Sequence, residues 1–150
     1  MSDLLIRPAT RSDVPAIMAM LADDPLGAQR ESLDDPTPYL AAFTRIADDP
    51  HQHLMVAERD GRTVGPLQLT IVPGLSRRGA TRSIIEAVRI RADERGSGLG
   101  TRLVEWAVGE SRRHGCLLVQ LTSDASRTDA HHFYEKLGFE ASHVGFKRVL

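Results

Sequence analysis

Lysine, cysteine and aromatic side chains are scarce in this chain of 150 residues. Lys136 and Lys147 are its two lysines, and aromatic residues make up 5% of it. The single cysteine, Cys116, excludes disulfides and cysteine metal clusters within the chain. The formal net charge of -1 favours neither nucleic acid nor an anionic membrane as partner, and the few aromatics count against an RNA-binding domain.

Long apolar runs are missing as well. The opening sequence MSDLLIRPAT holds no long apolar segment and no cleavage pattern, so we expect a cytoplasmic protein without a membrane partner. The composition, 41% hydrophobic and 26% charged, is that of an ordinary globular protein. A length of 150 residues suits one domain with a real core, and we expect one domain over residues 1–150.

Strand-like and helix-like segments alternate along the chain. Period-two and apolar runs predict strands at 3–7, 53–59, 62–72, 83–90 and 116–122, with one or two more in 139–150. Helical spacing of apolar residues predicts helices at 11–21, 37–47, 99–114 and 126–137, and the polar stretch 22–36 reads as a loop. The Asp60-Gly61 pair predicts a hairpin turn, and Pro66 predicts a bulge or an edge position. The order indicates mixed α and β structure around one sheet.

The stretch RIRADERGSGLGTRL combines arginines with a glycine-rich turn before a predicted helix. Amides in the first turn of a helix lack partners within the helix, and the helix dipole favours negative charge there. Glycines let an anion approach that backbone, and Arg95 adds a fixed positive charge. A phosphate or pyrophosphate is therefore the expected ligand. The spacing fits neither a dinucleotide fingerprint nor a Walker loop, because Thr101 follows Gly98 by three residues and no lysine is near.

The arrangement R-x-x-G-x-G, at Arg95, Gly98 and Gly100, resembles the pyrophosphate signature of the GNAT family of N-acetyltransferases. The resemblance extends to AHHFYEKLGF, which matches the family pattern A-x-x-[LF]-Y-x-x-x-G-F, and to the N-terminal IRPATRSDVPAI and the hairpin MVAERDGRTVG. It thus covers nearly the whole chain. It implies an α/β (α+β) fold with a mixed, mostly antiparallel sheet of about six or seven strands, flanked by about four helices.

The resemblance also implies acetyl-CoA as co-substrate, without a metal. The family pairs the strand before the signature with the pantetheine arm and binds the pyrophosphate on the signature loop. The implied cofactor-binding residues are Val88, Arg89, Ile90, Arg95, Gly96, Ser97, Gly98, Gly100 and Thr101. Many members have asparagine where this chain has Arg127, so that role does not carry over and Arg127 stays open as a contact.

Two residues are the candidates for catalysis. In the family a tyrosine at the position of Tyr134 often protonates the leaving thiolate, and we carry that role over; packing of the last helix is the alternative. Glu86 is the candidate base, because strand alternation places it with Ile84, Val88 and Ile90 and a carboxylate on an apolar face accepts a proton more readily. The equal alternative is that Glu86 is structural and forms an ion pair with an arginine. A bulge in this strand would also change which residues share a face with Glu86, and the argument for a base would then fail.

One of the histidines at 51, 53, 131 and 132 is an alternative base, although surface or capping roles are expected for them, and no pair has a convincing metal spacing. The predicted function is acetyl transfer from acetyl-CoA to a primary amine of a small molecule or peptide, directly in a ternary complex. A non-catalytic acyl-CoA-binding regulatory module is the alternative. The acidic segment 22–53 and the basic segment 73–82 would suit an acceptor that carries both charges. The oligomeric state is open, with a homodimer as one option.

Overall fold

A computed structural model describes residues 3–150, and its centre is one five-stranded sheet in the order β1-β2-β3-β4-β5. The strands are β1 (Leu4–Pro8), β2 (Gln52–Arg59), β3 (Arg62–Val72), β4 (Arg82–Glu86) and β5 (Leu118–Leu121). The first four are antiparallel neighbours, whereas β5 runs parallel to β4. The mixed, mostly antiparallel sheet is therefore confirmed. The strand count is lower than expected, because residues 139–150 form no strand.

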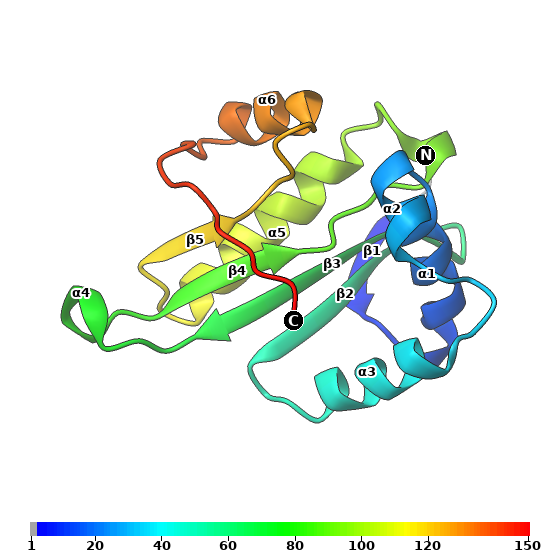
Figure 1. The fold of residues 1–150 in the computed structure, drawn as a ribbon, viewed down its shortest axis with the longest axis horizontal. Helices are drawn as coiled ribbons and strands as arrows, with labels where there is room; N and C mark the ends of the chain where they lie inside the picture. The colour runs from blue at the N-terminus through cyan, green and yellow to red at the C-terminus, as the bar shows by residue number, and fades with distance from the viewer. Residues whose placement is uncertain (1–2) are drawn as a thin grey trace.

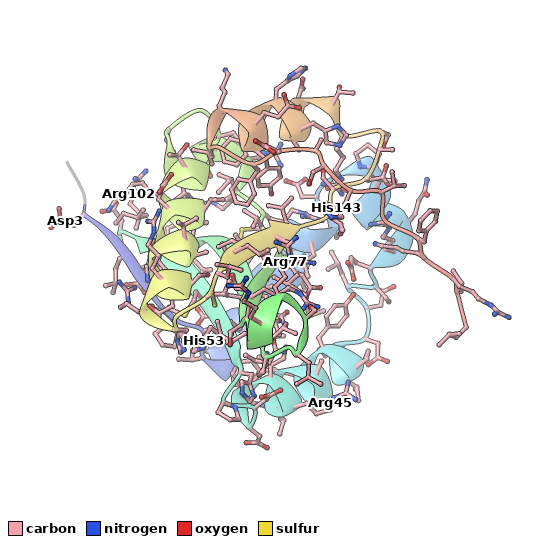
Figure 2. The ribbon with its side chains drawn as sticks, turned by 90° about the vertical axis from the view of Figure 1, so that its left-hand side faces the viewer. Asp3, Arg45, His53, Arg77, Arg102 and His143 are labelled. Carbon is pink, nitrogen blue, oxygen red and sulfur yellow. The ribbon has the colours of Figure 1, made fainter. Side chains whose placement is uncertain are left out.

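Helices lie on both faces of this sheet (Figures 1 and 2). They are α1 (Val14–Ala22), α2 (Pro25–Arg30), α3 (Thr37–Ala47), α4 (Ser76–Gly79), α5 (Leu99–Arg113) and α6 (Thr128–Lys136). In Figure 2, α5 lies on one side of the sheet and α2 and α3 lie on the other. The prediction of a loop over 22–36 is wrong for residues 25–30, where Asp24 caps α2 through the amide of Gly27 and Pro25 occupies its first turn.

The main core forms where α5 packs on β3. Leu99, Leu103, Val104 and Ala107 repeat at helical spacing along α5 and are buried against Leu67, Leu69 and other apolar residues of the sheet. A buried hydrogen bond of 2.7 Å between the hydroxyls of Ser83 and Ser111 also joins β4 to α5. This packing fixes the start of α5 relative to the end of β4.

The predicted strand 83–90 is interrupted at Ala87, whose φ of 57° is in the left-handed region. Up to that point the alternation is regular, and Ser83 and Ile85 face α5. Beyond it Ile90 also lies on the α5 side, because a Cβ on Gly65 would stand 3.0 Å from Leu103 and 3.3 Å from Ile90. Ile85 and Ile90 are five positions apart, and in a regular strand an odd number of steps leads to the opposite face. Their common side therefore requires a bulge between them. The prediction that Glu86 shares a face with Ile90 is therefore wrong.

The bulge coincides with the point where β4 and β5 part. Their parallel pairing ends at the pair Ile85–Leu121, and Figure 1 shows the two strands separating beyond it, with α6 above them. On the other side the chain stays attached to β3, since the amides of Arg89 and Arg91 donate to the carbonyls of Pro66 and Val64. Residues 87–91 thus have one edge paired and one edge free.

Candidate functional site

The loop before α5 presents a row of amides without backbone acceptors. Among residues 3–150, no backbone hydrogen bond is made by the N–H groups of Gly96 and of residues 98–101. Gly96 and Gly98 both have φ of 81°, a conformation that favours glycine, and Gly98 is the N-cap of α5. Ser97 differs, because its amide and its hydroxyl both donate to the carbonyl of Glu94. The loop can therefore bind an anion through several backbone donors.

Gly100 has a different reason for being glycine. A Cβ there would lie 3.3 Å from Cζ of Phe133 and 3.8 Å from Cγ1 of Ile90. The absence of a side chain lets α6 approach the first turn of α5. A bulky substitution at Gly100 would thus displace Phe133, so that variant cannot test anion binding separately from packing, whereas no atom lies within 4 Å of a Cβ on Gly98.

The free edge of residues 87–91 supplies more backbone donors. Because successive amides in an extended segment point to opposite sides, the pairing of Arg89 and Arg91 with β3 directs the amides of Val88 and Ile90 towards the opening between β4 and β5. Neither of these two amides has a backbone acceptor within the described part of the chain. An extended ligand can pair with this edge as a strand would.

Asp24, which sequence reasoning did not single out, lies between two arginines at this opening. Its carboxylate is 3.0 Å from Nη2 of Arg127 and 3.6 Å from Nε of Arg89. Burial acts to raise the pKa of Asp24, but the Gly27 amide and the two arginines outweigh it and hold this pKa below the ordinary value. A pocket beside this ion pair is lined by Asp24, Pro25, Leu26, Ser126 and Arg127.

The side chain of Arg89 is half-buried, as is that of Arg127. Burial and the neighbouring Arg127 lower the pKa of Arg89. One of its terminal nitrogens donates to the Val88 carbonyl at 2.9 Å, but its Nε is buried and has no hydrogen-bond partner among the described residues. An acceptor oxygen placed here would complete the hydrogen bonding of Arg89. Asp24 partly compensates these two positive charges, and Glu31 and Asp124 also lie close enough to influence Arg89 and Arg127 respectively.

The Tyr134 side chain from α6 lies close enough to both arginines for their charges to influence it. Its ring packs edge to face on Phe133 and Phe139, with centroids 5.1 and 5.8 Å apart. Burial raises the pKa of Tyr134, while Arg89 and Arg127 act against that rise. The phenol is therefore protonated at neutral pH and can donate a proton or a hydrogen bond. No hydrogen-bond partner of its hydroxyl is found in residues 3–150.

Glu86 is exposed and stands opposite Gln68 of β3. The same face carries Thr70 and Gln52, whose side-chain oxygen accepts hydrogen bonds from Gln68 and Thr70. Leu54 and Ile84 lie on this face too, since they pair with Gln68 and Thr70. The face around Glu86 is thus mixed, and it lacks Ile90, on which the argument from an apolar face also relied. The structural alternative finds no support either, because no ion pair or hydrogen bond of the Glu86 carboxylate occurs within the described residues.

The other side chains considered from the sequence have contacts of their own or lack the required reactivity. The exposed Arg95 reaches Asp23, at 3.3 Å. His131 contacts the carbonyl of Asp124. The Cys116 thiol is half-buried, and this burial raises its pKa, so it is a poor nucleophile. No group of three or more metal-ligating side chains is found in residues 3–150.

The basic segment 73–82, predicted to help hold the acceptor, lies far from the opening between β4 and β5 (Figure 1). The segment with Arg77 and Arg78 forms the short α4 at the far end of the β3–β4 hairpin, well away from α2 and α6 (Figure 1). It therefore adds no basic side chains to this site.

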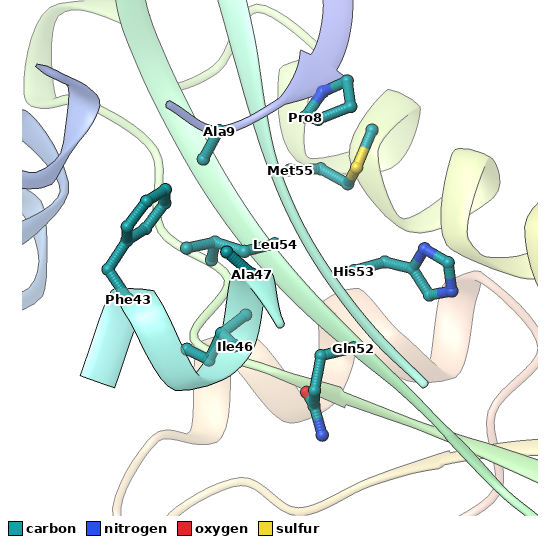
Figure 3. A pocket seen from close by; sticks show the side chains of 9 residues that line it. All are labelled: Pro8, Ala9, Phe43, Ile46, Ala47, Gln52, His53, Leu54 and Met55. Carbon is teal, nitrogen blue, oxygen red and sulfur yellow. The ribbon is translucent and has the colours of Figure 1, made fainter. Parts of the chain in front are cut away.

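A second pocket lies between α3 and β2, where Phe43, Ile46 and Ala47 face Leu54 (Figure 3). Its lining is mainly apolar and includes no residue of the β4–β5 opening.

In the part of the chain that the structure describes, no helix has both the length and the apolar character needed to cross a membrane.

Three of the following four matches to known proteins name acetyltransferases. The model of the acetyltransferase (GNAT) family matches residues 15–139. The aminoalkylphosphonate N-acetyltransferase of Salmonella typhimurium is 30% identical over 148 residues, which cover 97% of this chain and 90% of that protein. A putative acetyltransferase from Agrobacterium tumefaciens superposes with a TM-score of 0.83 at 27% identity, covering 97% of this chain and 99% of that chain. A transcriptional regulator from Bacillus halodurans gives a TM-score of 0.95 at 43% identity, covering 99% and 100%.

The environment of Tyr134 predicts a measurable titration. In a Tyr39→Phe variant Tyr134 is the only tyrosine, and we expect its ultraviolet ionisation midpoint above the value of about 10 of free tyrosine. Adding Arg127→Gln removes a cation that stabilises the phenolate, so the midpoint should rise further. Circular dichroism over the same pH range checks that the protein stays folded. A midpoint at or below about 10 in the Tyr39→Phe variant would contradict this description.

Proposed function

Because this chain belongs to the acetyltransferase (GNAT) family and is an N-acetyltransferase, we propose that it moves the acetyl group of acetyl-CoA directly to a primary amine in a ternary complex. We take residues 1–150 as one catalytic domain and the acceptor as a small molecule or peptide. The observation that carries the proposal is the free backbone edge at Val88 and Ile90, which leads into the loop of unpaired amides before α5.

The residues present fit acetyl-CoA. The amides of Gly96, Gly98, Gly100 and Thr101 would hold the pyrophosphate, with Arg95 adding its charge and Ser97 bracing the loop. The edge formed by Val88, Arg89 and Ile90 would pair with the pantetheine arm. When bound, acetyl-CoA supplies an activated acyl group as a thioester. No metal ligand is needed in this scheme.

Three groups of the chain would then act on the reaction. The amine must be neutral before it attacks, and Glu86 would take its proton, through water if the amine lies beyond direct reach. The Val88 amide would stabilise the negative charge that develops on the thioester oxygen. As the C–N bond forms and the C–S bond breaks, the departing thiolate would receive the proton of the Tyr134 hydroxyl, and the second proton that the nitrogen loses on becoming an amide would restore the phenol. Cys116 is not needed, because the acetyl group passes directly between the substrates.

The acceptor that suits the charges is an amine with an anionic group at its other end. Arg127 and the unsatisfied Nε of Arg89 would hold the anion, and the acidic turn at Asp23 and Asp24 would attract the ammonium group before it loses its proton. The name of the Salmonella relative, an aminoalkylphosphonate N-acetyltransferase, agrees with an acceptor of this kind. Arg89 would therefore lie between the two substrates: its guanidinium faces the acceptor, while its backbone stays bonded to β3 between the two amides that would pair with the cofactor.

Binding of coenzyme A can be tested at Gly98. Gly98→Ala adds a side chain within the row of free amides and strains a residue with φ of 81°. The strain should cost about 1 kcal/mol of folding free energy. Gly61→Ala is the matched control, with φ of 73° and no atom within 4 Å of the new Cβ, but in the β2–β3 turn. We expect similar losses of stability and, by calorimetry, coenzyme A affinity reduced about tenfold or more in Gly98→Ala alone. Equal affinities in both variants would refute the loop assignment.

The two catalytic roles differ in their dependence on pH. Tyr134→Phe should lower kcat by about a hundredfold or more at every pH below the phenol pKa, whereas Tyr39→Phe should leave it unchanged. Glu86→Gln should lower kcat/KM most at neutral pH and recover part of the rate at high pH, where more amine is already neutral. Glu105→Gln on the exposed face of α5 is its control. A pH–rate profile of Glu86→Gln with the wild-type shape would remove Glu86 as the base.

Selectivity for an anionic acceptor depends on Arg127 in this proposal. Arg127→Gln should lower kcat/KM for 2-aminoethylphosphonate about tenfold to a hundredfold, because a charged hydrogen bond to the acceptor is lost. The same variant should change kcat/KM little for n-propylamine, which has no anion. Arg112→Gln, on the exposed last turn of α5, controls for the loss of a charge. Equal losses of kcat/KM for both amines would show that Arg127 does not bind the anionic group of the acceptor.

A further inference from the structure

An ion pair joins the β2–β3 hairpin to the chain that leads into the glycine-rich loop. Arg59 is the last residue of β2, and Glu94 ends the short 3-10 turn Ala92–Glu94, directly before Arg95. Nη1 of Arg59 donates to a carboxylate oxygen of Glu94 at 2.5 Å. These two side chains are 22 and 16% exposed, whereas those of Arg95 and Asp23 are 56 and 55% exposed. Of the two ion pairs, that of Arg59 and Glu94 is therefore the better shielded from water and salt.

Glu94 holds the loop through its backbone. Its carbonyl accepts hydrogen bonds from the hydroxyl of Ser97, at 2.6 Å, and from the Ser97 amide, at 3.4 Å. Ser97 stands between Gly96 and Gly98, whose amides have no backbone acceptor in residues 3–150. The placement of these two free amides therefore depends on Glu94.

The charge of Glu94 is unfavourable at this place unless it is compensated. Glu94 stands two residues before Gly96, and no other acidic residue occurs before Glu105. A mostly buried carboxylate beside an anion-binding loop repels the anion, and it is costly in itself when it has no partner. In the described part of the chain, Arg59 is the cation paired with Glu94. Arg59 thus neutralises a negative charge at the edge of the loop.

This ion pair is not the one that stability alone would favour. The Nε of Arg59 is buried and has no hydrogen-bond partner among the described residues, so one donor of the guanidinium is unsatisfied. A buried donor without an acceptor costs folding free energy, and a buried ion pair recovers little beyond its own desolvation. The contact is better explained by the loop that it holds.

On the premise that this loop binds the pyrophosphate of acetyl-CoA, as in the proposed function, we propose that Arg59 is a positioning residue for the cofactor. Its guanidinium holds the Glu94 carboxylate towards β2 without touching the ligand. The Glu94 carbonyl then fixes Ser97, and the amides of Gly96 and Gly98 stay free to donate to an anion. Arg59 thereby organises the loop before the cofactor binds and removes the repulsion of the nearest acidic group.

Calorimetry with coenzyme A tests the charge part of this proposal. Arg59→Met should lower the affinity about tenfold or more, because it leaves Glu94 unpaired. Adding Glu94→Gln removes the unpaired charge and should restore the affinity at least about threefold. Arg59→Lys keeps a cation and should stay within about threefold of the wild type.

The exposed Arg62, the pairing partner of Arg59 on β3, provides the control for the loss of one positive charge. Arg62→Met should bind coenzyme A as the wild type does. Unchanged affinity in Arg59→Met would overturn the proposal. So would a double variant Arg59→Met/Glu94→Gln that binds no better than Arg59→Met.

Kinetics separate positioning from a general loss of stability. With 2-aminoethylphosphonate as acceptor, Arg59→Met should raise KM for acetyl-CoA about tenfold or more and change kcat at saturation by less than about threefold. An enzyme that is merely less stable would lose kcat and keep its KM. Thermal unfolding checks that each variant is folded. A lower kcat with unchanged KM for acetyl-CoA would overturn the positioning role.

Trypsin cleavage after the exposed Arg95 tests the loop without any ligand. Mass spectrometry of the products should show cleavage there at least about threefold faster in Arg59→Met than in the wild type, because the loop opens locally more often. Arg62→Met should be cleaved at the wild-type rate. Equal cleavage of Arg59→Met and the wild type would contradict the positioning role. A wild type that binds no coenzyme A would contradict the proposed function instead, so the two failures are distinguishable.

Discussion

The bulge at Ala87 is the constraint on which the candidate site depends. It follows directly on the last paired residues of β4 and β5, and from there the strands separate while the chain stays bonded to β3. Amides that would otherwise complete the sheet are thereby left with free donors. Continuous pairing of β4 and β5 would close this edge, and neither Val88 nor Ile90 could bind a ligand through its backbone.

The two halves of the site are joined electrostatically by one acidic turn. Asp23 pairs with Arg95 of the glycine-rich loop, and Asp24 pairs with Arg89 and Arg127 next to Tyr134. Pairs of exposed groups such as Asp23 and Arg95 contribute little to stability. An anion bound at the loop would therefore displace Arg95 from Asp23 at small cost. The half-buried carboxylate of Asp24 lies between Arg89 and Arg127 and partly compensates their charges.

The sequence was sufficient where one local pattern determines the structure. The hairpin at Asp60-Gly61, the amphipathic α5 and the glycine-rich loop each follow from residues close together in the chain, and all three are present. The family resemblance rested on such patterns, and the family is confirmed. The roles of Tyr134 and Glu86 and the cofactor contacts stay predictions.

The failures have long-range causes. Alanine rarely adopts a positive φ, so nothing in the sequence indicates the bulge at Ala87. The change of face at Ile90 that results from this bulge could therefore not be predicted either. Asp24 becomes important through arginines at 89 and 127, far away in the sequence. The Asp24-Pro25 pair, an N-cap followed by a first-turn proline, was the available signal for α2. The expected strands in 139–150 depend on a pairing partner, and an alternating pattern alone does not supply one.

The most direct test of the account is acetyl-CoA turnover by the wild-type protein against a panel of amines. The panel should hold 2-aminoethylphosphonate, amino acids, a dipeptide, a polyamine and an aminoglycoside, with coenzyme A release and the acetylated product both measured. The account predicts matched amounts of the two products, with the highest kcat/KM for a small amine that carries an anionic group. Binding of coenzyme A without turnover of any amine would contradict it and would favour a non-catalytic acyl-CoA-binding module.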